Sequence, residues 1–555
     1  MDHPDDIVRD VRWLTHTIMI SFIVFIVICI GILAAVPPVS RDALTHHLAI
    51  PKLYLANGGI YEIPDAIASY FPMNIDLLYM IPLMIGNDIG AKYIHFGFAL
   101  LTAALLYVYL SRRLGALYGT IGILLFLSLP IIVKLSISVY VDLALIFFSF
   151  AAQLSLLKWK TSGYRIRFLV ISAVLCGAAM GTKYNGIVVC ILLVFSTGYI
   201  YAQSSPAKDS QTQPFKEMRN ASLYCFLYLL IALVVFSPWV IRNCLWTGNP
   251  LYPLYDKLFN PSSPYIETSL NPFLIRKLVY QEEWLDILLV PLRIFFAGKD
   301  DVPALFDGRL NPYLLILAPI GMLFRGKVES RQVRLEKRIF TGFAILFVII
   351  VYFTRDMRIR YISPAIPALV IISVYGIHNI INRINRLDNR LMKKAAVILC
   401  GVAGMICIVQ NGSYLYAQFG IVKPIDYLSG KVDRQQYIEE FRPEYAVIRH
   451  INNNLPEKAK IFGLFVGNRR YYFDRATIID HEKFKSIIKT SSTEDDIVNA
   501  FNTMHATHII VGVDHFYKWI SANFSESEKR RITIFFNQKV KMLISKNNYI
   551  LYEIY

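Results

Sequence analysis

Runs of about 20 apolar residues recur along this chain of 555 residues, and they constrain its fold more than any other feature. A run of that length is what an α-helix needs to cross the hydrocarbon core of a bilayer. Apolar residues make up 55% of the sequence and charged residues 17%, against roughly 45–50% and about 25% in soluble domains. This balance excludes both a soluble enzyme and an intrinsically disordered chain.

The apolar runs predict about eleven transmembrane helices, so the expected fold is that of a polytopic α-helical membrane protein. We place the helices approximately at 15–36, 91–110, 117–133, 139–157, 168–182, 186–203, 221–240, 311–324, 339–354, 361–381 and 395–415. The first run is too long for a simple signal peptide and lacks a small-residue cleavage site. The seven cysteines show no CxxC spacing, so neither a zinc site nor a disulfide framework is indicated.

The positive charges orient these helices. With a cytoplasmic N-terminus, five cytoplasmic loops are all basic, as the positive-inside rule requires. Their cations are Arg112 and Arg113; Lys158, Lys160, Arg165 and Arg167; Lys208, Lys216 and Arg219; Arg325, Lys327, Arg331, Arg334, Lys337 and Arg338; and Arg383, Arg386, Arg390, Lys393 and Lys394. The sequence therefore predicts a multi-pass protein of the cell (inner) membrane with a periplasmic or extracellular C-terminus. The net charge of +17 is mostly this topological signal, and no nucleic-acid partner is expected.

Three larger segments then face the outer side of the membrane, at 37–90, 241–310 and 417–555. We expect residues 1–416 to form a transmembrane domain and residues 417–555 a soluble α/β domain. Strand-like runs at 460–466 and 508–512 alternate there with helical patterns such as 494–504. No internal repeat is visible, which argues against a transporter built from two related halves.

The segment after the first apolar run predicts a helix with readable ends. Ser40 is a suitable N-cap, and Gly58 and Gly59 form a suitable stop. Asp42 falls in the first turn, with His46 one turn later on the same face. A carboxylate and an imidazole are thus expected together just outside the membrane, although Asp42 could instead serve only the helix dipole.

Four later stretches of the sequence, together with this acidic loop, form a set of motifs in a fixed order along the chain. They are Leu129-Pro130 leading to Tyr140-Val141-Asp142-Leu143; Gly181-Thr182-Lys183-Tyr184-Asn185-Gly186; Ser237-Pro238-Trp239-Val240-Ile241-Arg242-Asn243 with Trp246-Thr247-Gly248-Asn249-Pro250-Leu251-Tyr252-Pro253; and Arg358-Ile359-Arg360-Tyr361-Ile362-Ser363-Pro364. The set, spread over most of residues 10–415, resembles the integral-membrane GT-C glycosyltransferases. These include protein mannosyltransferases, aminoarabinose transferases and oligosaccharyltransferases.

The resemblance implies that a sugar moves from a polyprenyl-phosphate donor to a glycan, lipid or protein acceptor on the outer face. Asp42 is the candidate general base, and in-line attack would invert the anomeric centre. Asp142, near the outer end of the fourth span, could orient the acceptor or a cation, or share the role of Asp42. A carboxylate that only reaches water from a helix start explains Asp142 equally well.

The donor phosphate should be bound by cations that depart from the positive-inside trend. These are Lys183, Arg242, Arg358 and Arg360, with Arg355 in the same region. Ordinary ion pairing, for instance with Asp356, is the alternative for the arginines of this group.

His46, Tyr54, Glu282 and Glu283 are candidates for contact with the acceptor or the sugar. Trp284 beside the two glutamates suits a sugar site, and an interfacial helix would explain it equally well. The usual acidic pair of the family is absent, because Arg41 precedes Asp42 and Ala43 follows it. We therefore expect no cofactor, with a divalent metal as the less favoured option.

Two other classes of membrane protein are alternative interpretations of the sequence. An O-antigen polymerase or ligase also has many spans and outer arginines, but that class usually carries its large loop late in the bundle. A transporter or lipid flippase predicts charges buried at mid-span and inverted repeats. Here the centres of the spans are nearly free of charge.

Overall fold

The computed structural model describes residues 4–203, 213–261, 271–323 and 329–555. By its internal contacts the chain forms two units. The first unit consists of Met1–Ala34, Tyr70–Ile75 and Lys92–Lys423, and the second of Ala35–Ser69, Asp76–Ala91 and Pro424–Tyr555. The second unit thus joins most of the segment between α1 and α4 to the C-terminal region.

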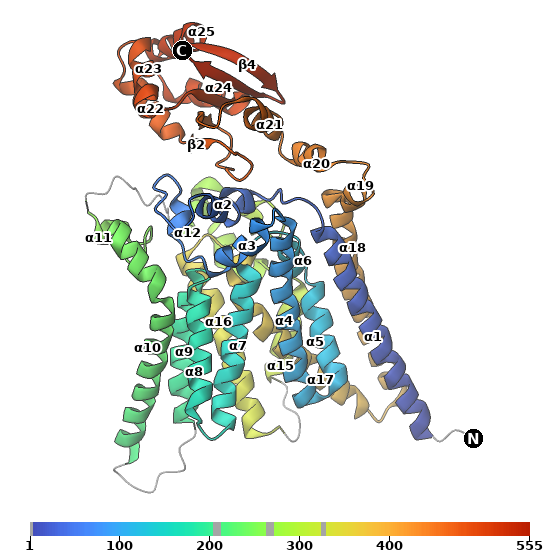
Figure 1. Ribbon diagram of the computed structural model, residues 1–555. Helices are drawn as coiled ribbons and strands as arrows, with labels where there is room; N and C mark the ends of the chain where they lie inside the picture. The colour runs from blue at the N-terminus through green and yellow to red at the C-terminus, as the bar shows by residue number, and fades with distance from the viewer. Residues whose placement is uncertain (1–3, 204–212, 262–270, 324–328) are drawn as a thin grey trace. The chain divides into compact units, whose positions relative to one another are not determined.

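Within the described residues, eight helices are long and apolar enough to cross a membrane. They are α1 (Pro4–Ala34), α4 (Ile89–Leu114), α7 (Asp142–Thr161), α9 (Asn185–Ala202), α10 (Gln213–Thr247), α16 (Arg331–Thr354), α17 (Ile366–Asn385) extended by the 3₁₀ turn η5 (Ile359–Ala365), and α18 (Arg390–Val422). Figure 1 shows the helices of the first unit as a bundle in which the first and last spans, α1 and α18, lie side by side. The predicted polytopic helical fold is confirmed.

The other three predicted spans differ in detail from continuous helices of full length. Two of them coincide with the shorter apolar helices α8 (Ile166–Met180) and α15 (Pro312–Leu323). The third, expected as one helix over 117–133, is instead α5 (Ala116–Ser128) followed by α6 (Pro130–Ser136) at an angle of 66°. Leu129 is extended because it precedes Pro130, whose ring also removes a helical N–H donor.

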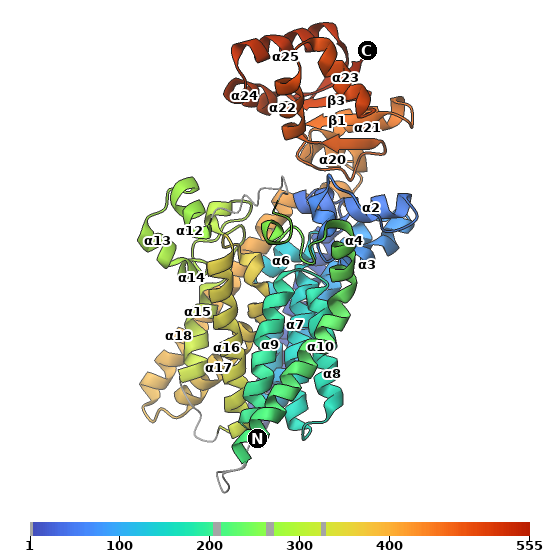
Figure 2. The same cartoon turned by 90° about the vertical axis from the view of Figure 1, so that its left-hand side faces the viewer.

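Helices α15 and α17 approach each other closely through two glycines (Figure 2). A Cβ atom on Gly321 of α15 would lie 2.0 Å from the carbonyl oxygen of Ile372. A Cβ atom on Gly376 of α17 would lie 2.3 Å from the carbonyl oxygen of Leu317. Small residues allow such backbone contact between membrane helices, where apolar burial alone gives little driving force.

The segment between α10 and α15 contains only short elements in its described part. They are α11 (Asp256–Phe259), α12 (Pro272–Leu274), the π-helical turn η3 (Ile275–Val279), α13 (Trp284–Leu288), α14 (Val290–Arg293) and the 3₁₀ turn η4 (Pro303–Leu305). Figure 2 shows α12, α13 and α14 gathered beside one end of α16.

The second unit contains a five-stranded mixed sheet in the order β2-β1-β3-β5-β4. Strands β1 (Lys460–Leu464), β2 (Ala476–Ile479) and β3 (His508–Gly512) are parallel, and β4 (Val540–Lys546) and β5 (Tyr549–Ile554) are antiparallel additions. Its helices are α19 (Pro424–Leu428), α20 (Arg434–Phe441), α21 (Tyr445–Asn454), α22 (His481–Thr490), α23 (Glu494–Thr503), α24 (Val513–Asn523) and α25 (Glu526–Gln538). The predicted α/β fold of the C-terminal region is confirmed.

Side chains of the sheet alternate between two apolar layers, as the pleat requires. Phe462 packs with Phe484 and Phe501 on one face, whereas Ile461 packs with Val447 and Leu551 on the other. Both faces are therefore covered, which is the usual condition for parallel strands.

The remaining elements of the second unit lie in its N-terminal part. They are the π-helical turn η1 (Ala43–His47), α2 (Ala49–Ala56), the 3₁₀ turn η2 (Ile67–Tyr70) and the apolar helix α3 (Asn74–Met84), of which Tyr70, Asn74 and Ile75 belong to the first unit. Lys52 of α2 donates hydrogen bonds from its ammonium group to the carbonyl oxygens of Tyr471 and Phe473, at 2.9 and 3.0 Å. The backbone N–H of Tyr471 also donates to the carbonyl oxygen of Leu44 at 3.1 Å. These bonds tie the segment that carries Asp42 to the C-terminal sheet domain.

We predict that Gly321→Ala destabilises the protein, because the added methyl group collides with backbone that has no rotamer to change. Overpacking of this kind costs about 1–3 kcal/mol, and we expect a lower melting temperature of the purified protein in detergent. The control is Gly342→Ala in α16, where a Cβ atom meets nothing within 4 Å. Equal melting temperatures for the two variants would contradict the close approach of α15 and α17.

Candidate functional site

A buried ion pair lies at the start of α7. The Lys183 ammonium is 2.7 Å from Oδ1 of Asp142, whose side chain is 1% exposed. The second carboxylate oxygen, Oδ2, is also buried and accepts no hydrogen bond within the described part of the chain. The structure therefore brings together Asp142 and Lys183, two of the residues predicted from sequence, and leaves one carboxylate oxygen open to a further donor.

The turn between α8 and α9 holds Lys183 in place. The N–H of Asn74 donates to the carbonyl oxygen of Gly181 at 2.9 Å. A Cβ atom on Gly181 would lie 2.3 Å from the side chain of Asn74, and one on Gly186 would lie 2.4 Å from the carbonyl oxygen of Ala179. The two glycines of this motif are thus required by close packing on both sides of the lysine.

His95 of α4 fixes the start of α7 on the other side. Its Nδ1 lies 2.9 and 3.0 Å from the carbonyl oxygens of Leu135 and Ser138, so this nitrogen carries the proton. Its Nε2 then accepts the backbone N–H of Leu143 at 3.0 Å. The sequence analysis did not predict this structural role of His95. The only sign of it in the sequence is a histidine inside an apolar run.

Arg360 joins the pair through aromatic rings. Its guanidinium lies 5.1 Å from the ring centroid of Tyr140 and 5.4 Å from that of Tyr361, and the Lys183 ammonium lies 5.3 Å from the same Tyr361 ring. Asn185 donates to the carbonyl oxygen of Tyr361 at 3.1 Å, which links the turn of Lys183 to η5. Two motifs about 180 residues apart in the sequence therefore place both cations around one aromatic ring.

Arg358 belongs to a neighbouring acidic cluster. Its guanidinium is 3.6 Å from Asp307, and the Lys134 ammonium is 3.0 Å from the same carboxylate. Lys134 also lies 3.6 Å from Asp300 and 3.3 Å from Asp301. Arg358 is thus partly neutralised, in agreement with the alternative of ordinary pairing, but its partner is Asp307.

Arg276 is a fully buried cation that holds the segment between α10 and α15 against the turn before η5. It contacts Glu282 at 2.8 Å and Asp356 at 3.3 Å, and it donates to the carbonyl oxygen of Ala304 at 2.9 Å. The Tyr280 hydroxyl donates to Asp356 at 2.9 Å, and burial together with Asp356 raises the pKa of Tyr280 to about 12. This network fixes the backbone that leads to Arg358 and Arg360.

Glu282 and Glu283, the two predicted sugar ligands, have different surroundings. Glu282 is held by Arg276 and also by Arg293 at 3.1 Å, so it acts in the network just described. Glu283 is 80% exposed and lies 3.7 Å from Lys277. Only Glu283 presents its carboxylate to solvent.

Arg242 is held by the motif in which it lies. It stacks on Trp239 and Trp246, at 4.7 and 5.0 Å from their ring centroids, and donates to the carbonyl oxygen of Phe71 at 3.1 Å. Its neighbour Asn243 donates to the Tyr184 hydroxyl at 3.1 Å. Burial raises the pKa of Tyr184, so this phenol stays neutral and links Arg242's helix to the turn of Lys183.

Asp42 lies in the second unit, immediately before η1, and is half-buried. The predicted helix is present, but Ser40 does not cap it, since its Oγ makes no hydrogen bond within the described chain. The turn η1 is π-helical, a wider form that is frequent at functional sites. The predicted stop is confirmed, because α2 ends at Ala56 and Gly58 adopts a positive φ of 74°.

The histidines after Asp42 differ in their partners. His47 is buried and its Nδ1 lies 2.6 Å from the carboxylate of Asp76, itself 3% exposed. His46 is half-buried, and its Nδ1 lies 2.8 Å from the Thr45 hydroxyl. Tyr54, a predicted acceptor ligand, has a fully buried side chain that packs against Tyr61. Sequence reasoning missed Asp76, whose partner lies 29 residues earlier in the chain.

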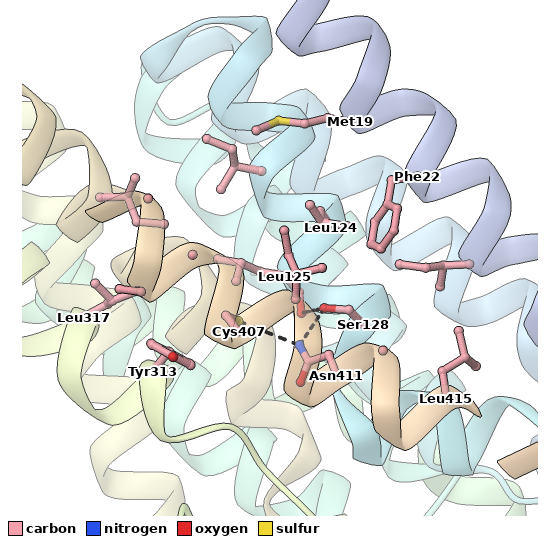
Figure 3. Close-up of a pocket in the computed structure, with 18 of the residues that line it drawn as sticks. Met19, Phe22, Leu124, Leu125, Ser128, Tyr313, Leu317, Cys407, Asn411 and Leu415 are labelled. Atoms are coloured by element: carbon pink, nitrogen blue, oxygen red, sulfur yellow. Dashed lines mark hydrogen bonds between the residues drawn. The ribbon is translucent and has the colours of Figure 1, made fainter. Parts of the chain in front are cut away.

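An apolar cavity of about 810 Å³ lies among α1, α5, α15, α17 and α18 of the first unit. Figure 3 shows Met19, Phe22, Leu124, Leu317 and Leu415 around it. Its α18 wall, from residue 397 to residue 419, extends for about 33 Å at 1.5 Å per residue, close to the thickness of a bilayer core of about 30 Å.

One polar position interrupts this apolar wall. Asn411 of α18 points toward Ser128 and donates to its hydroxyl at 2.9 Å (Figure 3). Asn411 also accepts from Asn311 at 3.1 Å, so the amide is satisfied without water. The described residues contain no group of three or more His, Cys, Asp or Glu side chains placed to hold a metal ion.

The architecture is similar to that of known membrane enzymes. The crystal structure of ArnT from Cupriavidus metallidurans in the apo state matches with a TM-score of 0.55 at 13% identity, covering 98% of each chain. ArnT bound to undecaprenyl phosphate matches with a TM-score of 0.55 at 14% identity, covering 97% of each chain. The apo oligosaccharyltransferase of Archaeoglobus fulgidus matches with a TM-score of 0.51 at 12% identity, covering 89% of this chain and 69% of that chain.

Sequence comparison adds one family. The model of the dolichyl-phosphate-mannose-protein mannosyltransferases matches residues 71–245. No curated protein matches the chain by sequence. The predicted resemblance is confirmed by this match and by the shared GT-C fold.

We predict that Arg276→Ala loosens the segment between α10 and α15, because it leaves Glu282 and Asp356 without their shared cation. Breaking a buried ion pair by removing one partner costs about 3–5 kcal/mol. We expect faster hydrogen exchange in residues 271–310 of the full-length protein. Lys277→Ala is the matched control, since Lys277 is adjacent but lies near the exposed Glu283 and over the exposed Trp284 ring, and not near Asp356. Unchanged exchange in Arg276→Ala would refute the pinning role.

Proposed function

We propose that this protein is a membrane glycosyltransferase that moves a sugar from a polyprenyl-phosphate donor to an acceptor on the outer face. The observation that carries the proposal is the buried pair of Asp142 and Lys183 beside Arg360. ArnT and the archaeal enzyme AglB, which share the fold, are described in complexes with undecaprenyl phosphate and dolichol-phosphate. Both ligands join an isoprenoid tail to a phosphate, and the cations of this site suit such a group.

Lys183 and Arg360 would bind the donor phosphate and stabilise the charge that it gains as the sugar leaves. Asp142 would act as a positioning residue, because one carboxylate oxygen already holds Lys183. Its open Oδ2 would receive a hydroxyl of the sugar or the acceptor. Arg358 and Arg242 would add positive potential from positions that their own partners fix.

The apolar cavity would hold the hydrocarbon tail of the lipid. A chain of contacts leads from the lining of this cavity to the cations. Tyr414 is next to the lining residue Leu415, and the Arg309 guanidinium lies 5.8 Å from the centroid of the Tyr414 ring. The backbone of Arg309 accepts the N–H of Ile131, three residues before Lys134, which shares Asp307 with Arg358. The tail and the phosphate of one lipid could thus be bound by neighbouring parts of the same unit.

The chemistry would be a single displacement at the anomeric carbon. The Asp42 carboxylate takes the proton of the acceptor hydroxyl while the acceptor oxygen bonds to that carbon. The bond from the anomeric carbon to the phosphate oxygen breaks, and polyprenyl phosphate leaves with its electron pair. Attack from the opposite face inverts the configuration. The acceptor is a glycan, a lipid or a protein, with His46 and Glu283 as its candidate ligands.

The orientation follows from the charges of the loops. Arg112 and Lys158 lie at the ends of α4 and α7 that are remote from Asp142. We place that basic end in the cytoplasm and the end with Asp142 outside, with the C-terminal sheet domain in the periplasm or extracellular space. In a bacterium this is the inner membrane. We propose that the reaction needs no cofactor, because the negative charge of the leaving phosphate is met by side-chain cations.

We predict that Asp42→Asn lowers sugar transfer at least a hundredfold while donor binding survives. The amide keeps the size of the side chain and removes only the base. The assay uses purified protein with a polyprenyl-phosphate sugar donor, together with a binding measurement on the same lipid. Asp65→Asn is the control, because Asp65 lies in the same loop and pairs with Arg470. Wild-type turnover in Asp42→Asn would sink Asp42 as the base.

We predict that Arg360→Gln weakens binding of polyprenyl phosphate about tenfold or more, since a charge-assisted contact to phosphate is worth about 1.5–3 kcal/mol. Lys257→Gln is the control, because Lys257 of α11 is an exposed cation with no role in the proposed site. Binding of the lipid phosphate is followed in detergent at fixed ionic strength. If both variants bind as the wild type does, the phosphate site lies elsewhere.

A further inference from the structure

The two ends of α7 lie in different chemical surroundings. Asp142 begins the helix, and Lys158 lies about 24 Å further along it at 1.5 Å per residue. At this far end, α4, α7 and α8 border a second cavity, of about 600 Å³. In Figure 1 the loop that joins α7 to α8 lies at the lower end of the bundle. A volume of this size is in the range of small-molecule sites, about 300–1,000 Å³.

The cavity carries positive charge that its own carboxylate does not neutralise. Arg113 is paired with the buried Glu336, which also accepts from Tyr109 at 2.9 Å and from Gln332 at 2.7 Å. Arg112 and Lys158 also line the cavity and are exposed. Within the described ranges neither of these two cations has a carboxylate at ion-pair distance. An anion of the right size could therefore bind to Arg112 and Lys158, beside Arg113, whose charge Glu336 already neutralises.

Most of the remaining lining is apolar, and part of it faces outward. Val108 of α4 is 42% exposed and Ile171 of α8 is 46% exposed, on spans that the bilayer surrounds. Leu154 of α7 lies one turn before Lys158 and continues the wall toward the membrane interior. Charge at the rim and hydrocarbon along the wall match the two parts of one ligand.

We propose that this cavity binds an anionic phospholipid, with its phosphate on Arg112 and Lys158 and an acyl chain along Val108, Leu154 and Ile171. A free anion would leave the apolar wall unused, and the head group of a zwitterionic lipid would bring a further cation to a site that already has two open ones. Basic pockets between membrane helices are a recognised way of binding lipid head groups. The site is independent of the proposed transfer reaction, because it involves the opposite end of the bundle.

The test is native mass spectrometry of the full-length protein in detergent with added phosphatidylglycerol or phosphatidylcholine. We expect phosphatidylglycerol to be retained at least fivefold more strongly than phosphatidylcholine. The double variant Arg112→Gln/Lys158→Gln should lose this preference. The matched control is Arg386→Gln/Arg390→Gln, which removes two exposed cations, one just after α17 and one at the first residue of α18. The control should retain phosphatidylglycerol as the wild type does.

Three results would overturn the proposal. The first is equal retention of the two lipids by the wild-type protein. The second is equal loss of phosphatidylglycerol in the double variant and in the control, which would indicate a general charge effect. The third is displacement of the lipid by inorganic phosphate at the same concentration, which would identify a site for a free anion. The wall is checked with Leu154→Ser, which should weaken phosphatidylglycerol retention although both cations remain.

Discussion

The buried pair of Asp142 and Lys183 is the contact on which the other motifs of the first unit depend. A carboxylate removed from water at the start of a membrane helix costs several kcal/mol unless a cation offsets it. Lys183 can do so only from the turn that Asn74, Gly181 and Gly186 hold in place. A hydrogen bond from Asn185 to the carbonyl oxygen of Tyr361 also connects this turn to η5. The dispersed motifs are thus parts of one polar structure at the end of the bundle.

The spans could be predicted because hydropathy is a local property of the chain. What it does not report is a bend, since the residues of α5 and α6 are equally apolar on both sides of Leu129. The proline that separates them was visible, but only the backbone conformation converts it into an angle of 66°. The strands β1 and β3 could be predicted for the same local reason, whereas the neighbours of each strand in the sheet depend on distant parts of the chain.

The cations of the site were predictable from topology, and their partners were not. Lys183 and Arg360 stood out because they depart from the positive-inside trend, and the structure places both around Tyr361. Glu282 and Glu283 are adjacent acidic residues that the sequence does not distinguish, yet in the structure Arg276 and Arg293 bind Glu282. A pairing over tens or hundreds of residues leaves no periodicity, and His47 with Asp76 or Arg358 with Asp307 are further cases.

The charges at the two ends of the bundle differ in a way that bears on function. Lys183 is already paired with a buried carboxylate, and Arg358 shares Asp307 with Lys134. In the proposed reaction, such neutralised cations would bind the phosphodiester of the donor weakly and would gain most from the extra negative charge of the departing phosphate, which is what catalysis of transfer requires. Arg112 and Lys158 have no such carboxylate within the described chain, so they suit a ligand that is retained. The same chemistry of cation and phosphate can thus serve turnover at one end and anchoring at the other.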